Sequence, residues 1–234
     1  MSLNMLKTNN EYEITYYKRE NFIDLRKEIN KINKIFCKEL KNPPQCKNYL
    51  YIISGTVNHK EKLAIKLDDG NLLVRKMEKE RIGDINEDIQ HYYEYTEAMN
   101  KWCRIDDFDL KNWFLKKRDC YFYFSYKTKF DYGELGFTIR EDNTFFIDIV
   151  NMKIAKQIQY IEFESCDYSN IIDYLKAFGQ KVQKELGFSP INLEMSKLAM
   201  CKSIKECKLP NHIDDFSDFI FSIFDLIYFE LLDL

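Results

Sequence analysis

The chain has 234 residues, of which 45% are hydrophobic and 31% charged, and its net charge is −3. This balance excludes a mainly disordered chain, and seven glycines and four prolines are too few for collagen-like repeats or glycine-rich phosphate loops. Residues 1–130 hold 25 basic and 20 acidic side chains, whereas residues 131–234 hold 10 and 18. This asymmetry fits either a separate basic and acidic surface or charges that cancel when the two halves pack together.

The first half of the chain predicts a helix, a β-meander and further helices. After an irregular start, apolar residues recur every three or four positions over 21–40, which predicts a helix that ends before Pro43-Pro44. Alternating residues predict strands over 49–57, 63–67 and 72–77, with Asp69-Gly70 as a hairpin turn. Helical spacing follows over 84–102 and again, in a short segment, over 108–115.

A second meander precedes the C-terminal helices. Strands are predicted over 121–126, 135–139, 144–150 and 158–164, and helices over 167–187, 192–207 and 213–232. The fold class is therefore predicted as α+β, with about seven strands in antiparallel β-meander sheets covered by about five helices. We expect residues 1–234 to form a single compact domain. A weak internal match leaves open two packed β-meander-plus-helix halves, 45–115 and 118–234, with the helix 21–40 in front.

The cysteines and the start of the chain predict a cytoplasmic location. The first residues contain no apolar stretch of the length that a signal peptide needs. Seven cysteines without a pairing pattern indicate reduced thiols. No window is long and apolar enough for a spanning helix, so no membrane partner is expected.

Common catalytic motifs are missing from the sequence. Walker and dinucleotide-binding glycine motifs, the nucleophile elbow and the zinc-protease motif are all absent, and there are only three histidines. The best zinc candidates, Cys201, Cys207 and His212, have unfavourable spacing on a predicted helix. We therefore expect no metal and no cofactor.

One group of acids offers an alternative catalytic interpretation. Asp148, Glu162 and Glu164 lie on predicted neighbouring strands, and convergence there would suit a metal-dependent nuclease or a nucleotide-acting hydrolase. The competing interpretation is the wet face of an antiparallel sheet, where acids are ordinary. A second alternative is binding of single-stranded nucleic acid. It would use Lys116, Lys117, Arg118 and Tyr121, which combine positive charge with an aromatic ring.

The C-terminal segment 213–232 is apolar nearly all round, which predicts deep burial or a second partner. The residues assigned to partner contact are Phe219, Phe221, Asp225, Tyr228 and Phe229. Together with the missing catalytic motifs, this segment favours a non-enzymatic intracellular protein-binding module, an inhibitor or antagonist of the immunity or phage-encoded type. Its partner would be a protein with a basic surface, or a second copy in a homodimer.

Overall fold

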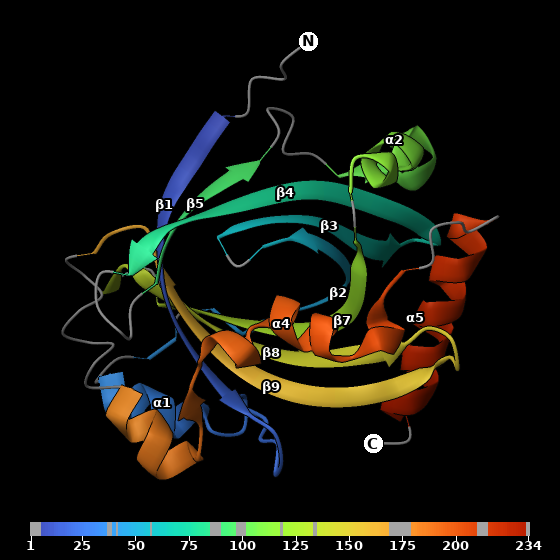
Figure 1. Cartoon of the computed structure of the whole chain (residues 1–234). Coiled ribbons are helices and arrows are strands. Elements are labelled where there is room, and N and C mark those ends of the chain that lie inside the picture. Colours follow the sequence, from blue (N-terminus) through green and yellow to red (C-terminus); the bar gives the residue numbers. More distant parts are fainter. Residues whose placement is uncertain are drawn as a thin grey trace.

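Eight long antiparallel strands form a closed barrel in the computed structural model of the chain (Figure 1). The structure describes residues 6–36, 39–40, 42–56, 58–84, 90–96, 102–117, 119–132, 135–168, 179–209 and 215–232. The barrel strands are β1 (Leu6–Lys18), β2 (Gln45–Gly55), β3 (His59–Asp68), β4 (Asn71–Asp84), β5 (Gln90–Thr96), β7 (Tyr121–Tyr132), β8 (Phe137–Asp148) and β9 (Lys153–Ser165). They are hydrogen-bonded in the order β1-β5-β4-β3-β2-β7-β8-β9, and pairing of β9 with β1 closes the ring.

Two-residue strands and short helices complete the described chain. The strand β6 (Cys103–Arg104) pairs with β4, and β10 (Ser189–Pro190) pairs with β1. The helices are α1 (Ile29–Phe36), α2 (Leu110–Leu115), α4 (Lys197–Ser203) and α5 (Phe216–Leu232). Single turns lie over Ile105–Asp107, Val182–Leu186, Leu193–Met195 and Lys205–Cys207. Strands therefore dominate, and no described helix is both long and apolar enough to cross a membrane.

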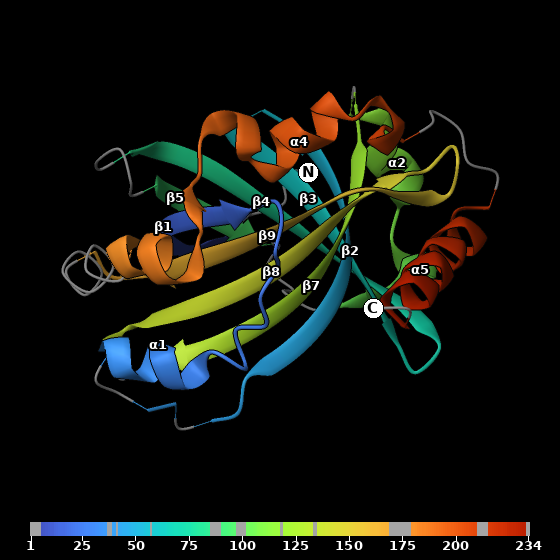
Figure 2. The same ribbon diagram turned by 90° about the horizontal axis from the view of Figure 1, so that it is seen from below.

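Strand alternation places apolar side chains on the outer face of much of the barrel wall. Helices α5 and α2 pack there on β2, β3, β4, β7 and β8, with Phe224 in edge contact with Phe124 at 6.0 Å between ring centroids. A second apolar cluster joins α1 to β1, β7, β8 and β9, again outside the ring. Figures 1 and 2 show α5 beside the barrel. Its apolar residues pack on the wall and shield it from water.

A third cluster closes one end of the barrel from within. Met195, Leu198 and Cys201, from the segment that leads into α4 and from α4 itself, pack against interior residues such as Tyr123 and Tyr160. The Tyr160 hydroxyl donates a hydrogen bond to the backbone oxygen of Met195 at 3.0 Å. Figure 2 shows α4 at one end of the ring of strands. We call this cluster the floor of the barrel.

The predicted fold class is wrong. Instead of sheets covered by about five helices, the chain forms a closed antiparallel barrel with few helices. The start of the chain, predicted to be irregular, is the closing strand β1, and the predicted helix 84–102 contains Gln90–Thr96, which is the strand β5. Tyrosines at positions 92, 93 and 95 fit both the helical and the strand period, so this segment becomes a strand only through its pairing with β1 and β4.

Several local predictions are confirmed and others need adjustment. The Asp69-Gly70 hairpin is confirmed, since both residues have positive φ and Asp68 pairs with Asn71. The last helix is confirmed over Phe216–Leu232, whereas the helix predicted over 192–207 is broken into α4 and two single turns. The predicted helix 21–40 shortens to Ile29–Phe36. Residues 169–178 of the predicted helix 167–187 lie outside the described residues.

Candidate active site

The interior of the barrel contains a charged cavity of about 330 Å³, within the size range of ligand pockets. It is lined by alternate residues of the strands, because in a β-strand every second side chain points to the same face. Ten Lys and Arg residues and five Glu residues are among those that line it. The basic ones are Lys47, Lys60, Lys62, Arg75, Lys79, Arg81, Lys127, Lys129, Arg140 and Lys197. With twice as many cations as carboxylates, the cavity is suited to an anion that carries several charges.

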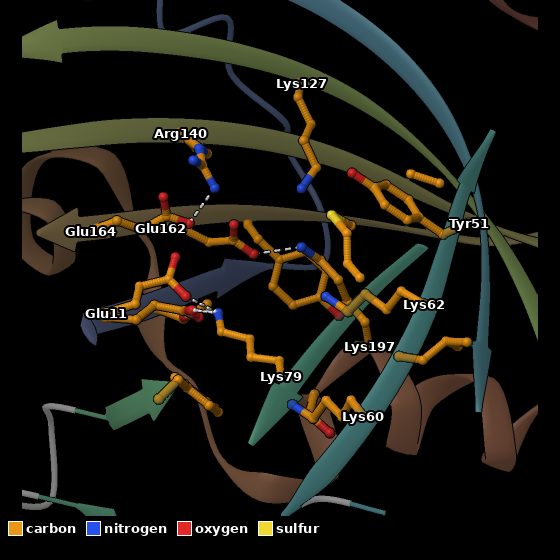
Figure 3. A pocket seen from close by; sticks show the side chains of 18 of the residues that line it. Glu11, Tyr51, Lys60, Lys62, Lys79, Lys127, Arg140, Glu162, Glu164 and Lys197 are labelled. Carbon is orange, nitrogen blue, oxygen red and sulfur yellow. Dashed lines mark hydrogen bonds and ion pairs between the residues drawn. The ribbon is translucent and has the colours of Figure 1, made fainter. Parts of the chain in front are cut away.

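One wall of the cavity carries the carboxylates (Figure 3). Glu11 and Glu13 alternate on β1, and Glu162 and Glu164 alternate on β9. The two strands pair so that Glu13 lies opposite Glu164. Carboxylate oxygens of Glu11, Glu13 and Glu164 all lie within 4.8 Å of one another, and all three residues are buried. We call these three residues the carboxylate triad.

A single lysine partly neutralises the triad. The Lys79 ammonium lies 2.7 Å from Glu11 Oε2 and 2.6 Å from Glu13 Oε2. Burial would raise the pKa of Glu13, but the charge of Lys79 outweighs it and lowers this pKa to about 2. Burial raises the pKa of Glu164 to about 8, although Arg140 donates a hydrogen bond to it at 2.5 Å. With all three carboxyls ionised, the triad would carry one negative charge more than Lys79 and Arg140 neutralise, and the raised pKa of Glu164 means that this group keeps its proton at neutral pH.

These residues fit a divalent cation. Three buried carboxylates on adjacent strands are the oxygen ligands that Mg²⁺ and Mn²⁺ prefer. Besides its ion pair with Lys79, Glu11 Oε2 makes no hydrogen bond of standard geometry within the described part of the chain. Burial, with the nearby charges of Glu11 and Glu162, raises the pKa of Glu164, and the proton that it holds is one that a bound cation would displace.

Lysines dominate the opposite wall, on β3 and β4. Lys60 and Lys62 point into the cavity, and neither has a carboxylate partner among the residues that the structure describes (Figure 3). Burial, together with the neighbouring lysines, lowers the pKa of Lys60 to about 8 and that of Lys62 to about 7. Because a bound anion would restore the charge on both ammonium groups, this wall is suited to phosphate oxygens.

Lys197 connects the cavity to the floor. Its ammonium lies 2.6 Å from Asp142 and 2.5 Å from Glu162, and Lys127 lies 3.2 Å from the same Asp142. Burial would lower the pKa of Lys197, but Asp142 and Glu162 raise it well above its usual value. These ion pairs fix α4 against the inside of the barrel, so the cavity is closed at that end.

The structure brings together two of the three predicted catalytic acids. Glu162 and Glu164 line the cavity. Asp148 lies at the far end of β8, where its carboxylate accepts hydrogen bonds from the backbone amides of Val150 and Asn151 in the turn to β9. Asp148 pairs with Lys153 whereas Glu162 pairs with Arg140, eight residues away on β8, a separation of roughly 26 Å along the strand.

The described residues of the predicted nucleic-acid patch lie in different settings. Lys117 pairs with Glu61 and lies over the ring of Trp113. Tyr121 is half-buried beside Lys208, and Lys116 is exposed at the end of α2. Arg118 lies outside the described residues.

The residues predicted for partner contact divide between two faces of α5. Phe219 and Phe221 pack against the outer cluster, and Phe219 contacts Phe122 at 5.6 Å between centroids. Asp225, Tyr228 and Phe229 face outward, and Phe229 is 74% exposed. The zinc candidates Cys201 and Cys207 are buried in the floor, and His212 lies outside the described residues.

Sequence reasoning missed most of the cavity, including Glu11, Glu13 and the interior lysines. A signal was present, since Glu11-Tyr-Glu13 and Glu162-Phe-Glu164 share one alternation of acid and aromatic residue. In an open antiparallel sheet, the polar face of each strand faces solvent. In a closed barrel that face points inward.

No protein-family model matches the chain, and no curated protein matches it either. Three similar solved structures illustrate the comparison with known folds. The PH1819 protein of Pyrococcus horikoshii OT3 has 14% sequence identity and a TM-score of 0.45 over 82% of this chain and 99% of that chain. The Mimivirus capping enzyme triphosphatase has 12% identity and a TM-score of 0.40, over 75% and 88%. The S. pombe RNA triphosphatase Pct1 has 11% identity and a TM-score of 0.37, over 85% and 84%.

The prediction of a non-enzymatic inhibitor is wrong. Its premise was a chain without a reaction centre, but the barrel encloses a cavity in which a carboxylate triad faces a wall of lysines. Every TM-score is below 0.5, so these likenesses carry no functional argument for this chain.

Proposed function

We propose that the chain is a divalent-cation-dependent phosphohydrolase that draws the terminal phosphates of a polyphosphate substrate into the barrel. The observation that carries this proposal is the opposition of two walls in one cavity, with the carboxylate triad on β1 and β9 and unpaired lysines on β3. Of the two activities considered for the acids, hydrolysis of a nucleotide-type polyphosphate is favoured over a nuclease. A continuous strand would have to pass through the floor.

Glu11, Glu13 and Glu164 are the residues that would hold the cation. A divalent cation held there would neutralise charge on the phosphate oxygens and polarise the phosphorus–oxygen bond. Water then adds to the terminal phosphorus, and the anhydride bond breaks to give orthophosphate and the shortened substrate. The chain's own contribution is to position the phosphates and to stabilise the negative charge on them.

The basic residues divide this work between them. Lys60 and Lys62 have no acid to neutralise within the described chain, so they are free to bind phosphate oxygens. Arg140 contacts Glu164 and lines the cavity, so it can bridge a carboxylate and a phosphate. The apolar floor excludes bulk water from this end, which strengthens each of these charge interactions.

Phosphate release from inorganic tripolyphosphate with Mg²⁺ or Mn²⁺ tests the proposal. Glu13→Gln and Glu164→Gln should each abolish metal-dependent turnover and also the thermal stabilisation of the protein by Mn²⁺. The matched control is Glu185→Gln, since Glu185 is exposed outside the barrel. If tripolyphosphate neither binds nor is hydrolysed by the unmodified protein, the proposal is refuted.

A further inference from the structure

The two ends of the cavity differ in character. Interior residues alternate along β2, and Ile53 and Tyr51 belong to the floor cluster. Gln45 and Lys47 line the cavity on the same strand but are exposed. Six residues separate Ile53 from Lys47, or about 20 Å of strand. The substrate therefore enters at the end marked by Lys47, which we call the mouth.

An aromatic pair lies between the floor and the mouth. The rings of Tyr49 and Trp102 are stacked, with centroids 5.7 Å apart and planes within 3° of parallel, and both residues line the cavity. Tyr49 follows Lys47 in the interior face of β2. Trp102 immediately precedes β6, whose pairing of Cys103 with Val74 brings it beside Arg75 of β4. Both rings are half-buried.

Positive charge surrounds this pair. The Lys66 ammonium, which is paired with Asp68, lies 5.3 Å from the centre of the Trp102 ring. Arg75 lines the cavity without a carboxylate partner in the described chain, and its Nε is buried without a hydrogen bond. A cationic heterocycle would be repelled here. A neutral base that is attached to phosphates would be attracted through them and could stack on an aromatic face.

The spacing to the carboxylate triad matches one extended ligand. Lys79 contacts the triad, and Arg75 lies four residues before it on the same interior face of β4, about 13 Å away. A chain of phosphates that ends at the triad therefore runs past Lys62 and Arg75 toward the aromatic pair. Whatever group carries the phosphates lies at Tyr49 and Trp102.

We propose that Tyr49 and Trp102 form a stacking site for a nucleobase, so that the substrate is a nucleoside 5′-triphosphate, either free or at the 5′ end of an RNA. This inference rests on the proposed function and adds to it the group that the phosphates must carry. Discrimination against inorganic tripolyphosphate then comes from the stacking, which is worth roughly 5- to 150-fold in affinity for each base.

The chain contains only two tryptophans, which provides a direct probe. Trp113 is 6% exposed and packs in the outer cluster at α2, away from the cavity. In Trp113→Phe, the remaining fluorescence reports on Trp102 alone. Titration with the non-hydrolysable analogue adenosine 5′-(β,γ-imido)triphosphate should quench it, whereas inorganic tripolyphosphate should leave the emission nearly unchanged. Both titrations are made without divalent cation, and calorimetry confirms binding in each.

Variants of Trp102 separate stacking from packing. Trp102→Leu should lower the affinity for the nucleotide analogue roughly 5- to 150-fold relative to tripolyphosphate, and Trp102→Phe should restore most of that ratio. Thermal unfolding of both variants identifies any general loss of structure. If Trp102 serves only as packing for the floor, both ligands lose affinity equally, and the base site is refuted.

The remaining outcomes distinguish the two proposals. Equal affinity for analogue and tripolyphosphate, without quenching, refutes the base site and leaves the proposed function standing. Binding of neither ligand refutes both. A 5′-triphosphorylated oligoribonucleotide that binds more tightly than the free analogue supports the base site and identifies RNA as the source. Weaker binding of the oligoribonucleotide, with quenching by the free analogue, supports the site for free nucleotides.

Discussion

Replacement of Lys62 by methionine should make the free protein more stable and impair its binding of polyphosphate. The Lys62 side chain lies on the interior face of β3, and its ammonium is 6.0 Å from the centre of the Tyr51 ring. Burial is the largest cause that lowers its pKa from 10.5 to about 7, and the positive charges of neighbouring lysines, Lys79 first among them, contribute the rest. Methionine keeps the length of the side chain and removes the charge.

The expected gain in the free energy of unfolding of Lys62→Met follows from the pKa of Lys62. A fall from 10.5 to about 7 corresponds to at most about 5 kcal/mol of penalty on the charged form. Since Lys62 keeps some access to the cavity, water there reduces the expected gain to about 1–3 kcal/mol. The folded-state pKa is the lower one, so the penalty is complete below about pH 7, where Lys62 is protonated in both states. It disappears as the pH approaches 10.5, where the unfolded chain also loses the proton.

Urea denaturation at about pH 6 and about pH 9.5 measures this difference. Lys62→Met should exceed the unmodified protein in free energy of unfolding at the lower pH, and the gap should narrow at the higher one. Its affinity for tripolyphosphate should fall about tenfold or more. Lys111→Met, an exposed substitution on α2, is the matched control. A Lys62→Met protein that is less stable at pH 6, or that binds tripolyphosphate normally, contradicts the reasoning.

Three further predictions concern the floor, α5 and the mouth. Lys197→Met should destabilise the fold by about 3–5 kcal/mol, because it leaves Asp142, which is fully buried, with one cation fewer; unchanged urea denaturation would contradict this. Phe224→Ala should cost about 3–5 kcal/mol, whereas Phe229→Ser, at a residue that is 74% exposed, should leave the melting temperature nearly unchanged. Tripolyphosphate affinity should fall steeply with added salt, and Lys47→Gln should reduce that slope in calorimetric titrations across several salt concentrations.

The sequence predicted individual turns and helices better than it predicted the closure of the strands into a barrel. Local chemistry determines the Asp69-Gly70 turn and the apolar period of α5, and both were predictable because their signals lie within a few residues. The strand β1 has no such local marker. It becomes a strand by pairing with β5 on one side and β9 on the other, and β9 is more than a hundred residues away in the chain.

The same closure explains why two of the acids were recognised as a pair but not as part of a site. Glu162 and Glu164 share one face of β9, which alternation alone predicts. Their partners Glu11 and Glu13 are placed beside them by the register of β1 with β9. A register between strands so far apart cannot be read from either strand alone.

The apolar core of this protein lies outside the barrel, and the charged side chains lie inside it. This arrangement explains both the aromatic composition of the chain and the charged cavity on which the proposed function depends. The outer wall is apolar, so it needs α2 and α5 as cover, and this accounts for the apolar inner face of the C-terminal helix. The inner wall carries lysines whose burial disfavours their charge. Such an interior is poorly stabilised when empty and is stabilised by any polyanion that binds it. Tripolyphosphate added to the free protein should therefore raise its melting temperature. An unchanged melting temperature would contradict this explanation of the interior lysines.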